Sequence, residues 1–140
     1  MNSGIRFGII GAGFIANVFA GALRETGETL VAVASRRKEI AAEFADNHGG
    51  MRVFESWNDL VASDGVDAVY VATPTSAREE ICLAAARHKK HVLAEKPFAS
   101  LESLCKITTA CRANGVAFMD ATHFVHHPRT RRLKQASLKP

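Results

Sequence analysis

The sequence predicts an α/β fold in which a doubly wound parallel sheet has the strand order 3-2-1-4-5-6. Two observations support this prediction. Short apolar runs alternate with longer amphipathic segments, which is the pattern of parallel strands covered by helices on both faces. The first apolar run ends in a glycine-rich turn at residues 11–16, where a strand would pass into a helix. Because crossovers between parallel strands are right-handed, the alternation favours this strand order.

The strands are expected at the apolar runs, and the helices at the segments with helical periodicity between them. The expected strands are residues 5–10, 29–34, 51–54, 68–72, 91–94 and 116–119. The expected helices are residues 14–24, 37–47, 75–90 and 100–112, with a further helical turn at residues 57–61. Residues 120–140 are expected to form a loop and one more helix.

Residues that start or stop helices mark several of these boundaries. Ser56 and Ser100 are placed to cap the helices that follow them, and residues 76–79, Ser-Ala-Arg-Glu, match a capping box. Gly27 and the Gly-Gly pair at residues 49–50 are expected to end the helices before them.

Length and composition indicate one soluble globular domain. The chain has 140 residues, of which 47% are hydrophobic and 23% are charged, so a core can form without disulfides. The cysteines, Cys82, Cys105 and Cys111, are odd in number and lack metal-binding spacing. This argues against a disulfide framework or a zinc site and favours a reducing cytoplasm. Cys105 shares a helical face with Leu101 and Leu104 and is expected in the core.

A secretory or membrane segment is the alternative interpretation of the first apolar stretch. Residues 7–23 follow the basic Arg6 and are mostly apolar. However, glycines and Asn17 interrupt the stretch, and it is shorter than the roughly 20 residues that a span needs. A second strand pattern follows it at residues 29–34. We therefore expect a cytoplasmic protein with no membrane partner.

The net charge of +4 is mild. The basic excess lies largely near the C-terminal end, at Arg129, Arg131, Arg132, Lys134 and Lys139. Such a cluster could bind nucleic acid. A solvated helix face is the more common explanation, so no nucleic-acid partner is expected.

The glycine-rich turn, Gly-Ala-Gly-Phe-Ile-Ala, has the G-x-G-x-x-A form of a dinucleotide-binding motif. Gly11 would permit a tight turn, Gly13 would let the backbone approach a pyrophosphate, and Ala16 would let the helix lie against the sheet. The first helical turn, at Phe14 and Ile15, would then point its N–H groups at the phosphates. The segment therefore predicts a dinucleotide site.

The residues after the second strand favour NADP as the cofactor. About 20 residues beyond the glycines, an NAD site normally presents Asp or Glu to the ribose. This chain has Ser35, Arg36 and Arg37 there. A hydroxyl followed by guanidinium groups suits a 2′-phosphate, because arginine binds phosphate through paired, charge-assisted hydrogen bonds. NAD is the alternative cofactor, since Arg36 and Arg37 could be ordinary exposed helix residues.

Ligands of doubly wound sheets bind outside the carboxyl ends of the strands. In this sequence the residues just beyond those ends are polar or flexible. We therefore expect one edge of the sheet to gather Gly11, Ser35, Thr73, Glu95, Lys96 and Asp120.

A family resemblance appears at residues 94–97, Ala-Glu-Lys-Pro, which follow the fifth strand. Together with the glycine-rich turn and Thr73-Pro74, they resemble the Gfo/Idh/MocA family of oxidoreductases. The resemblance implies a Rossmann-type NAD(P)-binding domain over residues 1–125, followed at residues 126–140 by a C-terminal tail or the start of a linker. It also implies hydride transfer between NADP and a sugar, a polyol or a related hydroxyl or carbonyl compound.

The resemblance implies a role for each matching residue. The cofactor contacts would be Gly11, Gly13, Phe14 and Ile15 at the pyrophosphate, Ser35 and Arg36 at the adenosine ribose and its phosphate, Thr73 and Pro74 at the nicotinamide ribose, and Glu95 and Lys96 near the nicotinamide. Lys96 would also be the catalytic residue, in contact with the substrate hydroxyl. Loss of hydride from an alcohol carbon requires that the hydroxyl proton be taken or polarised. A surface Glu-Lys pair in a loop is the alternative.

The sequence departs from the family pattern at several positions. Thr75 and Arg78 stand where family members often have Asn and His. Asp120 and Val125 stand where Glu and Arg are common. The histidines that follow the sixth strand match no standard metal-binding spacing, so no metal site is expected at His123, His126 and His127.

The resemblance implies a second α/β domain with an open antiparallel sheet in the family enzymes, and these 140 residues are expected to hold the nucleotide-binding domain without it. The chain is therefore expected to bind NADP(H), and to be inactive or weakly active on a small-molecule substrate unless a second domain is supplied. The alternative is a non-catalytic, NADP(H)-binding regulatory or partner-binding module. Apolar surface that a second domain would cover could also produce a homo-oligomer.

Overall fold

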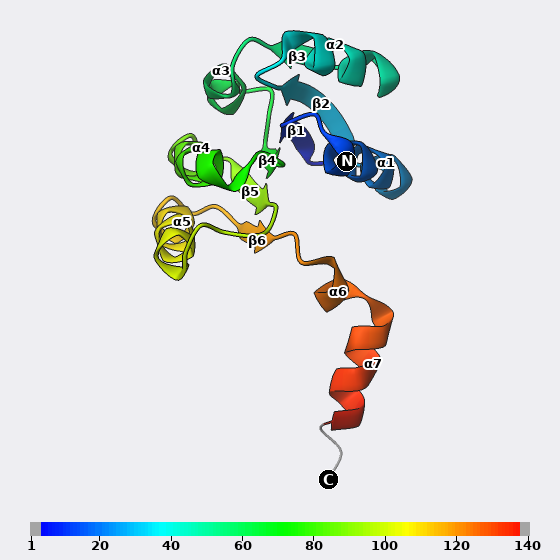
Figure 1. Ribbon diagram of the computed structural model, residues 1–140, viewed down its shortest axis with the longest axis vertical. Helices are drawn as coiled ribbons and strands as arrows, with labels where there is room; N and C mark the ends of the chain where they lie inside the picture. The colour runs from blue at the N-terminus through cyan, green and yellow to red at the C-terminus, as the bar shows by residue number, and fades with distance from the viewer. Residues whose placement is uncertain (1–3, 138–140) are drawn as a thin grey trace.

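A computed structural model describes residues 4–137 of the chain (Figure 1). Its centre is a 6-stranded sheet with the order β3-β2-β1-β4-β5-β6, as the sequence predicts. All neighbouring strands run parallel. The strands are β1 (Arg6–Ile10), β2 (Thr29–Ala34), β3 (Arg52–Phe54), β4 (Ala68–Val71), β5 (His91–Ala94) and β6 (Phe118–Asp120).

Helices connect the strands in the expected alternation. They are α1 (Phe14–Thr26), α2 (Lys38–Asn47), α3 (Trp57–Ala62), α4 (Thr75–Arg87), α5 (Leu101–Ala113), α6 (His123–His126) and α7 (Pro128–Ser137). The largest boundary difference is at the end of α4, which was expected at Lys90. It ends earlier because Lys89 adopts a left-handed conformation, with φ of 60°. The Lys90 N–H then donates back to the Ala85 carbonyl at 2.9 Å.

Helices cover both faces of the sheet (Figure 1). On one face α3, α4 and α5 pack through Leu60, Ile81 and Ile107. On the other face α1 and α2 pack through small residues and Phe44. Successive strand residues point to opposite faces. For this reason Val69 and Val71 of β4 join the first core, while Tyr70 between them joins the second.

Two details of helix packing differ from expectation. Cys105 is exposed, and Leu101 keeps 77% of its surface accessible. The buried stripe of α5 is instead Ser103, Ile107 and Cys111, spaced four residues apart. Cys105 lies two residues, or about 200°, around the helix from Ser103, so it faces away from the core. The core position expected for Cys105 is therefore wrong.

The capping box expected at residues 76–79 is also wrong. The N-cap of α4 is Pro74, and no side-chain cap is present at this helix end within the described residues. The Thr75 hydroxyl donates instead to the Pro97 carbonyl, at 3.4 Å. The caps expected from Ser56 and Ser100 are confirmed, because their hydroxyls accept from the Asp59 and Ser103 N–H groups, respectively.

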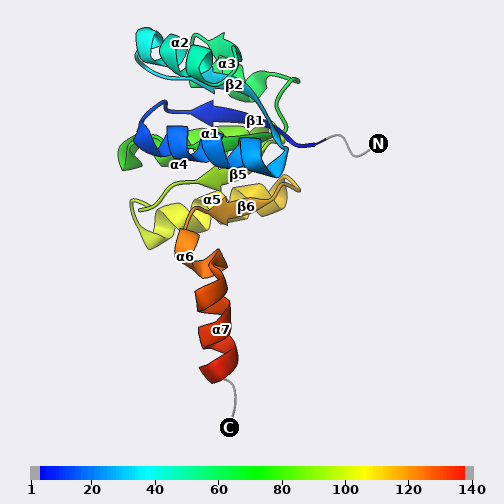
Figure 2. The same ribbon diagram turned by 90° about the vertical axis from the view of Figure 1, so that its right-hand side faces the viewer.

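The chain after β6 projects away from the sheet. Figure 2 shows α6 and α7 extending from the body of the molecule in a single arm. Helix α7 is exposed along nearly its whole length and carries Arg129, Arg131, Arg132 and Lys134. Lys139, the last residue of the expected basic cluster, lies outside the described residues. Among residues 4–137, no helix is long and apolar enough to cross a membrane.

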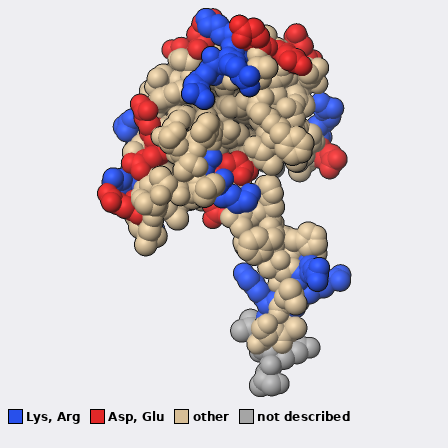
Figure 3. Space-filling view, viewed as in Figure 1, with Lys and Arg blue, Asp and Glu red and all other residues tan. Residues whose placement is uncertain are grey.

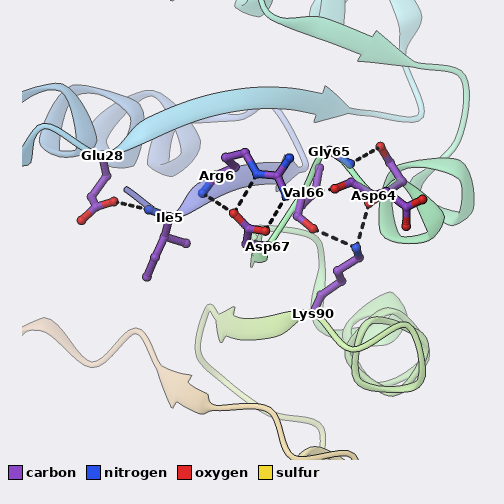
Figure 4. A network of polar contacts seen from close by, with 9 residues as sticks. Ile5, Arg6, Glu28, Asp64, Gly65, Val66, Asp67 and Lys90 are labelled. Atoms are coloured by element: carbon purple, nitrogen blue, oxygen red, sulfur yellow. Dashed lines mark hydrogen bonds and ion pairs between the residues drawn. The ribbon is translucent and has the colours of Figure 1, made fainter. Parts of the chain in front are cut away.

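The amino ends of the central strands are joined by a polar network (Figure 4). The Arg6 guanidinium pairs with the Asp67 carboxylate, with one N–O distance of 2.6 Å, and also donates to the Asp64 carbonyl. The buried Lys90 ammonium donates to the Ser63 and Val66 carbonyls, each at 2.8 Å. This network closes the edge of the sheet opposite the glycine-rich turn.

Candidate functional site

The glycine-rich turn joins the carboxyl ends of three neighbouring strands. The Gly11 N–H donates to the Ala34 carbonyl of β2 at 2.8 Å. Gly11 has φ of +98°, and a Cβ built on it would lie 2.6 Å from the Ala72 carbonyl oxygen beyond β4. Both the backbone conformation and the close approach therefore require glycine at this position.

Gly13 differs from Gly11, because the protein's own packing does not require it. It has φ of −88°, and a Cβ built on it would meet no atom of the described residues within 4 Å. Gly13 is the N-cap of α1. The first turn of this helix, all of which the structure describes, contains no acidic residue. The side chain of Phe14, the first residue of α1, is 84% exposed. The open space above a helix N-terminus fits the pyrophosphate of a dinucleotide.

The basic segment after β2 lies beside this turn, because its neighbour Ala34 is hydrogen-bonded to Gly11. Ser35 is half-buried and accepts a hydrogen bond from the Arg37 N–H at 3.4 Å. Arg36 is exposed. Basic side chains gather at the end of the molecule where β2, β3 and α2 lie (Figure 3).

The turn after β4 contains a hydroxyl that lacks a partner. The Thr73 Oγ1 atom is buried and makes no hydrogen bond within residues 4–137. The adjacent Pro74 is exposed and opens α4. A buried hydroxyl without a partner is uncommon in folded proteins, so this turn holds a polar group that the described residues do not satisfy.

Glu95, directly after β5, is a buried carboxylate with several partners. Its Oε1 accepts a 2.6 Å hydrogen bond from the Tyr70 hydroxyl, and its Oε2 lies 3.3 Å from the Lys96 ammonium. Burial by itself would raise the pKa of Glu95, but the hydrogen bonds from Tyr70 and Lys96, together with the charges of Lys96 and His123, outweigh burial and lower it. The carboxylate is therefore held as an anion beneath Lys96.

The positively charged Lys96 side chain lies at the carboxyl ends of the strands, which we call the rim of the sheet. Its side chain is 50% exposed, and its ammonium also lies 3.4 Å from the Ala121 carbonyl. The peptide bond between Lys96 and Pro97 is cis. An ammonium anchored on one side and open to solvent on the other is placed to meet an incoming hydroxyl or carbonyl group.

The segment after β6 contributes one further side chain. His123 Nε2 lies 3.7 Å from Glu95 Oε1. Asp120 is exposed, and its carboxylate accepts from the Thr122 N–H at 2.9 Å. His127 has its Nδ1 in contact with the Arg129 N–H at 3.1 Å. Of the histidines that follow β6, His123 is thus the one in contact with the Glu95–Lys96 pair.

Arg78 is a member of this region that sequence reasoning identified only as a departure from the family pattern. It belongs to α4 and is 4% exposed. Its guanidinium donates to the Thr73 carbonyl and to the Pro97 carbonyl. Burial lowers the pKa of Arg78, and the nearby Glu95 carboxylate is among the charges that oppose this effect. The position of an arginine among the apolar residues of α4 is the sequence signal that could have identified Arg78 as part of this region.

The expected site residues thus gather in two groups along one edge of the sheet. The first group, at the ends of β1 and β2, holds Gly11, Gly13, Phe14, Ile15, Ser35 and Arg36. The second group, at the ends of β4 and β5, holds Thr73, Pro74, Glu95 and Lys96. The open space at Gly13 and the unpartnered Thr73 hydroxyl fit a dinucleotide that crosses from one group to the other.

Comparison with known proteins agrees with this geometry. The family model for the Gfo/Idh/MocA oxidoreductases, NAD-binding Rossmann fold, matches residues 5–122. The chain is 38% identical over 133 residues to the scyllo-inositol 2-dehydrogenase (NADP(+)) IolU of Bacillus subtilis. That alignment covers 94% of this chain and 40% of the relative, so the chain spans less than half the length of the curated protein.

Solved structures show the same fold. The 3-ketoreductase KijD10 of Actinomadura kijaniata, in complex with NADP and TDP-benzene, superposes with a TM-score of 0.89 at 34% identity, covering 96% of this chain and 42% of that one. GenD2 from gentamicin A biosynthesis, in complex with NAD, has a TM-score of 0.90 at 26% identity, covering 99% and 40%. This chain therefore belongs to the Gfo/Idh/MocA family of oxidoreductases, with the family's NAD-binding Rossmann domain over residues 5–122.

Proposed function

We propose that this chain is the nucleotide-binding domain of an NADP(H)-dependent oxidoreductase that acts on a sugar, a polyol or a related hydroxyl or carbonyl compound. The observation that carries the proposal is the Glu95–Lys96 pair, with 3.3 Å between carboxylate and ammonium. This pair follows β5, on the same edge of the sheet as the glycine-rich turn. Relatives named for inositol and for a deoxy-glucose derivative support the substrate class.

The proposed cofactor site uses both groups of rim residues. Gly11 and Gly13 give the backbone close access to the pyrophosphate, whose charge the first turn of α1 binds at Phe14 and Ile15. In the second group, Thr73 and Pro74 pass beside the nicotinamide ribose. The buried hydroxyl without a partner at Thr73 supports that contact.

NADP is proposed over NAD because the ribose-binding position lacks a carboxylate. Ser35 and the exposed Arg36 follow β2 directly, beside the glycine-rich turn. A guanidinium can bind a 2′-phosphate through two charge-assisted hydrogen bonds, and a nearby carboxylate would repel that phosphate. Relatives of both kinds exist, since KijD10 is a complex with NADP and GenD2 with NAD.

In the proposed reaction, Lys96 is the catalytic residue and manages the substrate proton. The nicotinamide, when bound, accepts or supplies the hydride. Lys96 polarises the substrate oxygen and exchanges a proton with it, while Glu95 holds the ammonium in place from the buried side. Glu95 is itself oriented by Tyr70. Because the Lys96 side chain is half exposed, water reaches the reacting oxygen, and we expect little turnover from these 140 residues alone.

We also propose the domain division expected from the sequence, a nucleotide-binding domain over residues 1–125 and a connecting segment over residues 126–140. The exposure of α7 along nearly its whole length supports this division. The same arm exposes apolar side chains, including Phe124 at 67% and Leu133 at 60%. Self-association through them would appear as a concentration-dependent mass in sedimentation.

Calorimetric titration of the 140-residue chain with NADPH and with NADH tests the cofactor proposal. We expect NADPH to bind more tightly than NADH, and Arg36→Ala to remove most of the difference. Arg112→Ala is the matched control, because this exposed arginine lies in the last turn of α5, which leads into the amino end of β6, opposite the rim. Absence of binding by either nucleotide would contradict the proposal.

A turnover assay distinguishes the proposed enzyme domain from the alternative, a nucleotide-binding regulatory or partner-binding module. NADP reduction is followed with a panel of polyols and sugars, for the chain and for Lys96→Met. Slow turnover that disappears in Lys96→Met supports an enzyme. Measurable turnover that is equal in both proteins would contradict the catalytic role of Lys96 and favour the module.

A further inference from the structure

Arg78 connects two turns that come from different strands. Its guanidinium donates one hydrogen bond to the Thr73 carbonyl, after β4, and another to the Pro97 carbonyl, after β5. The Thr75 hydroxyl shares the second acceptor, at 3.4 Å. These are the turns that carry Thr73 and Lys96, the residues assigned above to the nicotinamide ribose and to the substrate oxygen.

The burial of Arg78 is costly, which argues that the connection has a purpose beyond filling space. The residue is 4% exposed, and its Nε is buried without a hydrogen-bond partner in the described part of the chain. A buried charge is tolerated only when its contacts compensate for lost hydration. The compensation here comes from backbone carbonyls of the two turns, so the guanidinium and the turns stabilise one another.

We infer that Arg78 is a positioning residue that holds the Thr73–Pro74 turn and the Lys96–Pro97 turn at a fixed separation. The planar, rigid guanidinium fork sets that separation, which a flexible ammonium could not do as well. Arg78 thereby keeps the nicotinamide-side contacts and the Lys96 ammonium in one geometry. This inference rests on the proposed function for its consequence, and on the observed contacts for its structural part.

The strand order makes the effect of Arg78 local. The two turns follow β4 and β5, whereas the glycine-rich turn and the Ser35–Arg36 segment follow β1 and β2, across the centre of the sheet. A dinucleotide that crosses this centre has its adenosine half over β1 and β2 and its nicotinamide half over β4 and β5. Loss of Arg78 should therefore weaken the nicotinamide half of binding and leave the adenosine half unchanged.

The test compares two ligands on the same chain. NADPH reports on the whole site, and adenosine 2′,5′-bisphosphate reports on the adenosine half alone. The variants are Arg78→Met, which keeps the length of the side chain without its donors, and Arg78→Lys, which restores a positive donor. Arg87→Ala, at the exposed end of the same helix, is the control. Thermal melting of each variant establishes that it is folded.

We expect Arg78→Met to weaken NADPH binding by about tenfold or more and to change binding of the bisphosphate by less than about twofold. Arg78→Lys should recover part of the NADPH affinity. Equal weakening of both ligands, or of neither, would overturn the inference. A wild-type chain that binds neither ligand would instead contradict the proposed function.

A cofactor-free measurement keeps the structural part testable in that case. Amide hydrogen exchange is followed in the ligand-free chain at residues 73–77 and 96–99. Faster exchange in both segments of Arg78→Met, with partial recovery in Arg78→Lys, supports the connection between the turns. Unchanged exchange in both segments would overturn it.

Discussion

The Tyr70 hydroxyl lies 2.6 Å from Oε1 of Glu95, and this hydrogen bond links the buried middle of β4 to the candidate site at the rim. Tyr70 is 1% exposed, and its ring packs on Phe19 of α1 with 4.0 Å between centroids. Burial, and then the bond to Glu95, raises the pKa of Tyr70 above its ordinary value. Tyr70 therefore remains a neutral donor, and the position of the Glu95 carboxylate follows from core packing.

Tyr70→Phe should destabilise the fold in a pH-dependent manner. Removal of the hydroxyl leaves a buried carboxylate with one donor fewer, so we expect a loss of about 1–2 kcal/mol in the free energy of unfolding at pH 7. The hydrogen bond helps to lower the pKa of Glu95. Its stabilisation is complete above the unfolded-state pKa and is lost as the pH falls through the lower folded-state pKa. Urea unfolding at pH 7 and at pH 3 measures both values.

Glu95→Gln supplies the control for that prediction. In the Glu95→Gln background, the Tyr70 hydroxyl faces a neutral amide, and its removal should cost less than in the wild type. The four proteins of this double-mutant cycle therefore give the coupling between the two side chains. If Tyr70→Phe had the same cost in both backgrounds and at both pH values, the carboxylate would not be what the hydroxyl stabilises.

Substitution of Gly11 should mainly reduce stability, whereas substitution of Gly13 should mainly reduce NADPH affinity. A methyl group at Gly11 would lie 2.6 Å from a backbone carbonyl oxygen at a φ of +98°, so Gly11→Ala should cost about 2–4 kcal/mol of stability. A methyl group at Gly13 has open space around it, so Gly13→Ala should cost less than about 1 kcal/mol. It should nevertheless weaken NADPH binding about tenfold or more, because the methyl group occupies the approach to the pyrophosphate.

Thermal melting and calorimetric titration of the two glycine variants check this separation. Gly21→Ala in the middle of α1 is the control for a glycine with open space away from the rim. It should bind NADPH as the wild type does and be more stable by up to about 1 kcal/mol, because alanine is favoured over glycine in a helix interior. A Gly13→Ala protein that binds NADPH with unchanged affinity would remove the argument that the open space holds a phosphate.

The strand order could be predicted because it depends on patterns that are local in the sequence. Each apolar run carries its own burial signal, and the right-handed crossover rule converts the order along the chain into an order in space. The glycine-rich turn was predictable for a similar reason, since Gly11 must take a left-handed conformation wherever this turn occurs. These parts of the fold need no knowledge of distant contacts.

The contacts of Arg78, Tyr70 and Cys105 could not be predicted in the same way. Arg78 pairs with carbonyls five and nineteen residues away, and Tyr70 with a carboxylate twenty-five residues away. The burial predicted for Cys105 is wrong for a different reason. The face of α5 that is buried depends on its docking angle against α4 and the sheet, and helical periodicity alone allows more than one apolar stripe. Long-range packing decided each case.

The ion pair between Arg6 and Asp67 should make stability depend on acid pH. The hydrogen bond from Arg6 is the main cause that lowers the pKa of Asp67 from 3.8 to about 2. Because the folded-state value is the lower one, the stabilisation is full above pH 3.8 and is lost as the pH falls toward 2. Asp67→Asn should lower Tm by about 1–4 °C at pH 7, a small effect because both side chains are partly exposed.

Urea midpoints between pH 5 and pH 2.5 measure the acid dependence of this pair. The difference in urea midpoint between the wild type and Asp67→Asn should decrease as the pH falls from about 5 to about 2.5. Asp64→Asn is the matched control, because Arg6 hydrogen-bonds to the backbone carbonyl of Asp64, while the Asp64 carboxylate acts on Arg6 through its charge alone and more weakly than Asp67 does. If the difference in urea midpoint stayed the same at every pH, Asp67 would stabilise the fold through something other than its charge.

Exchange of the residues after β2 should reverse the cofactor preference. In the Ser35→Asp, Arg36→Ala protein, the new carboxylate can accept hydrogen bonds from both ribose hydroxyls of NADH, and it repels the 2′-phosphate of NADPH. Each lost charge-assisted hydrogen bond is worth about 1.5–3 kcal/mol, so the ratio of the NADPH and NADH dissociation constants should change by about a hundredfold. Arg112→Ala is the control, since this exposed arginine lies in the last turn of α5, away from the residues that follow β2. Calorimetric titration of the three proteins with both nucleotides gives the ratios directly. An unchanged NADPH affinity in the double variant would mean that the 2′-phosphate does not bind at this segment, and Arg36 would then be only an exposed residue before α2.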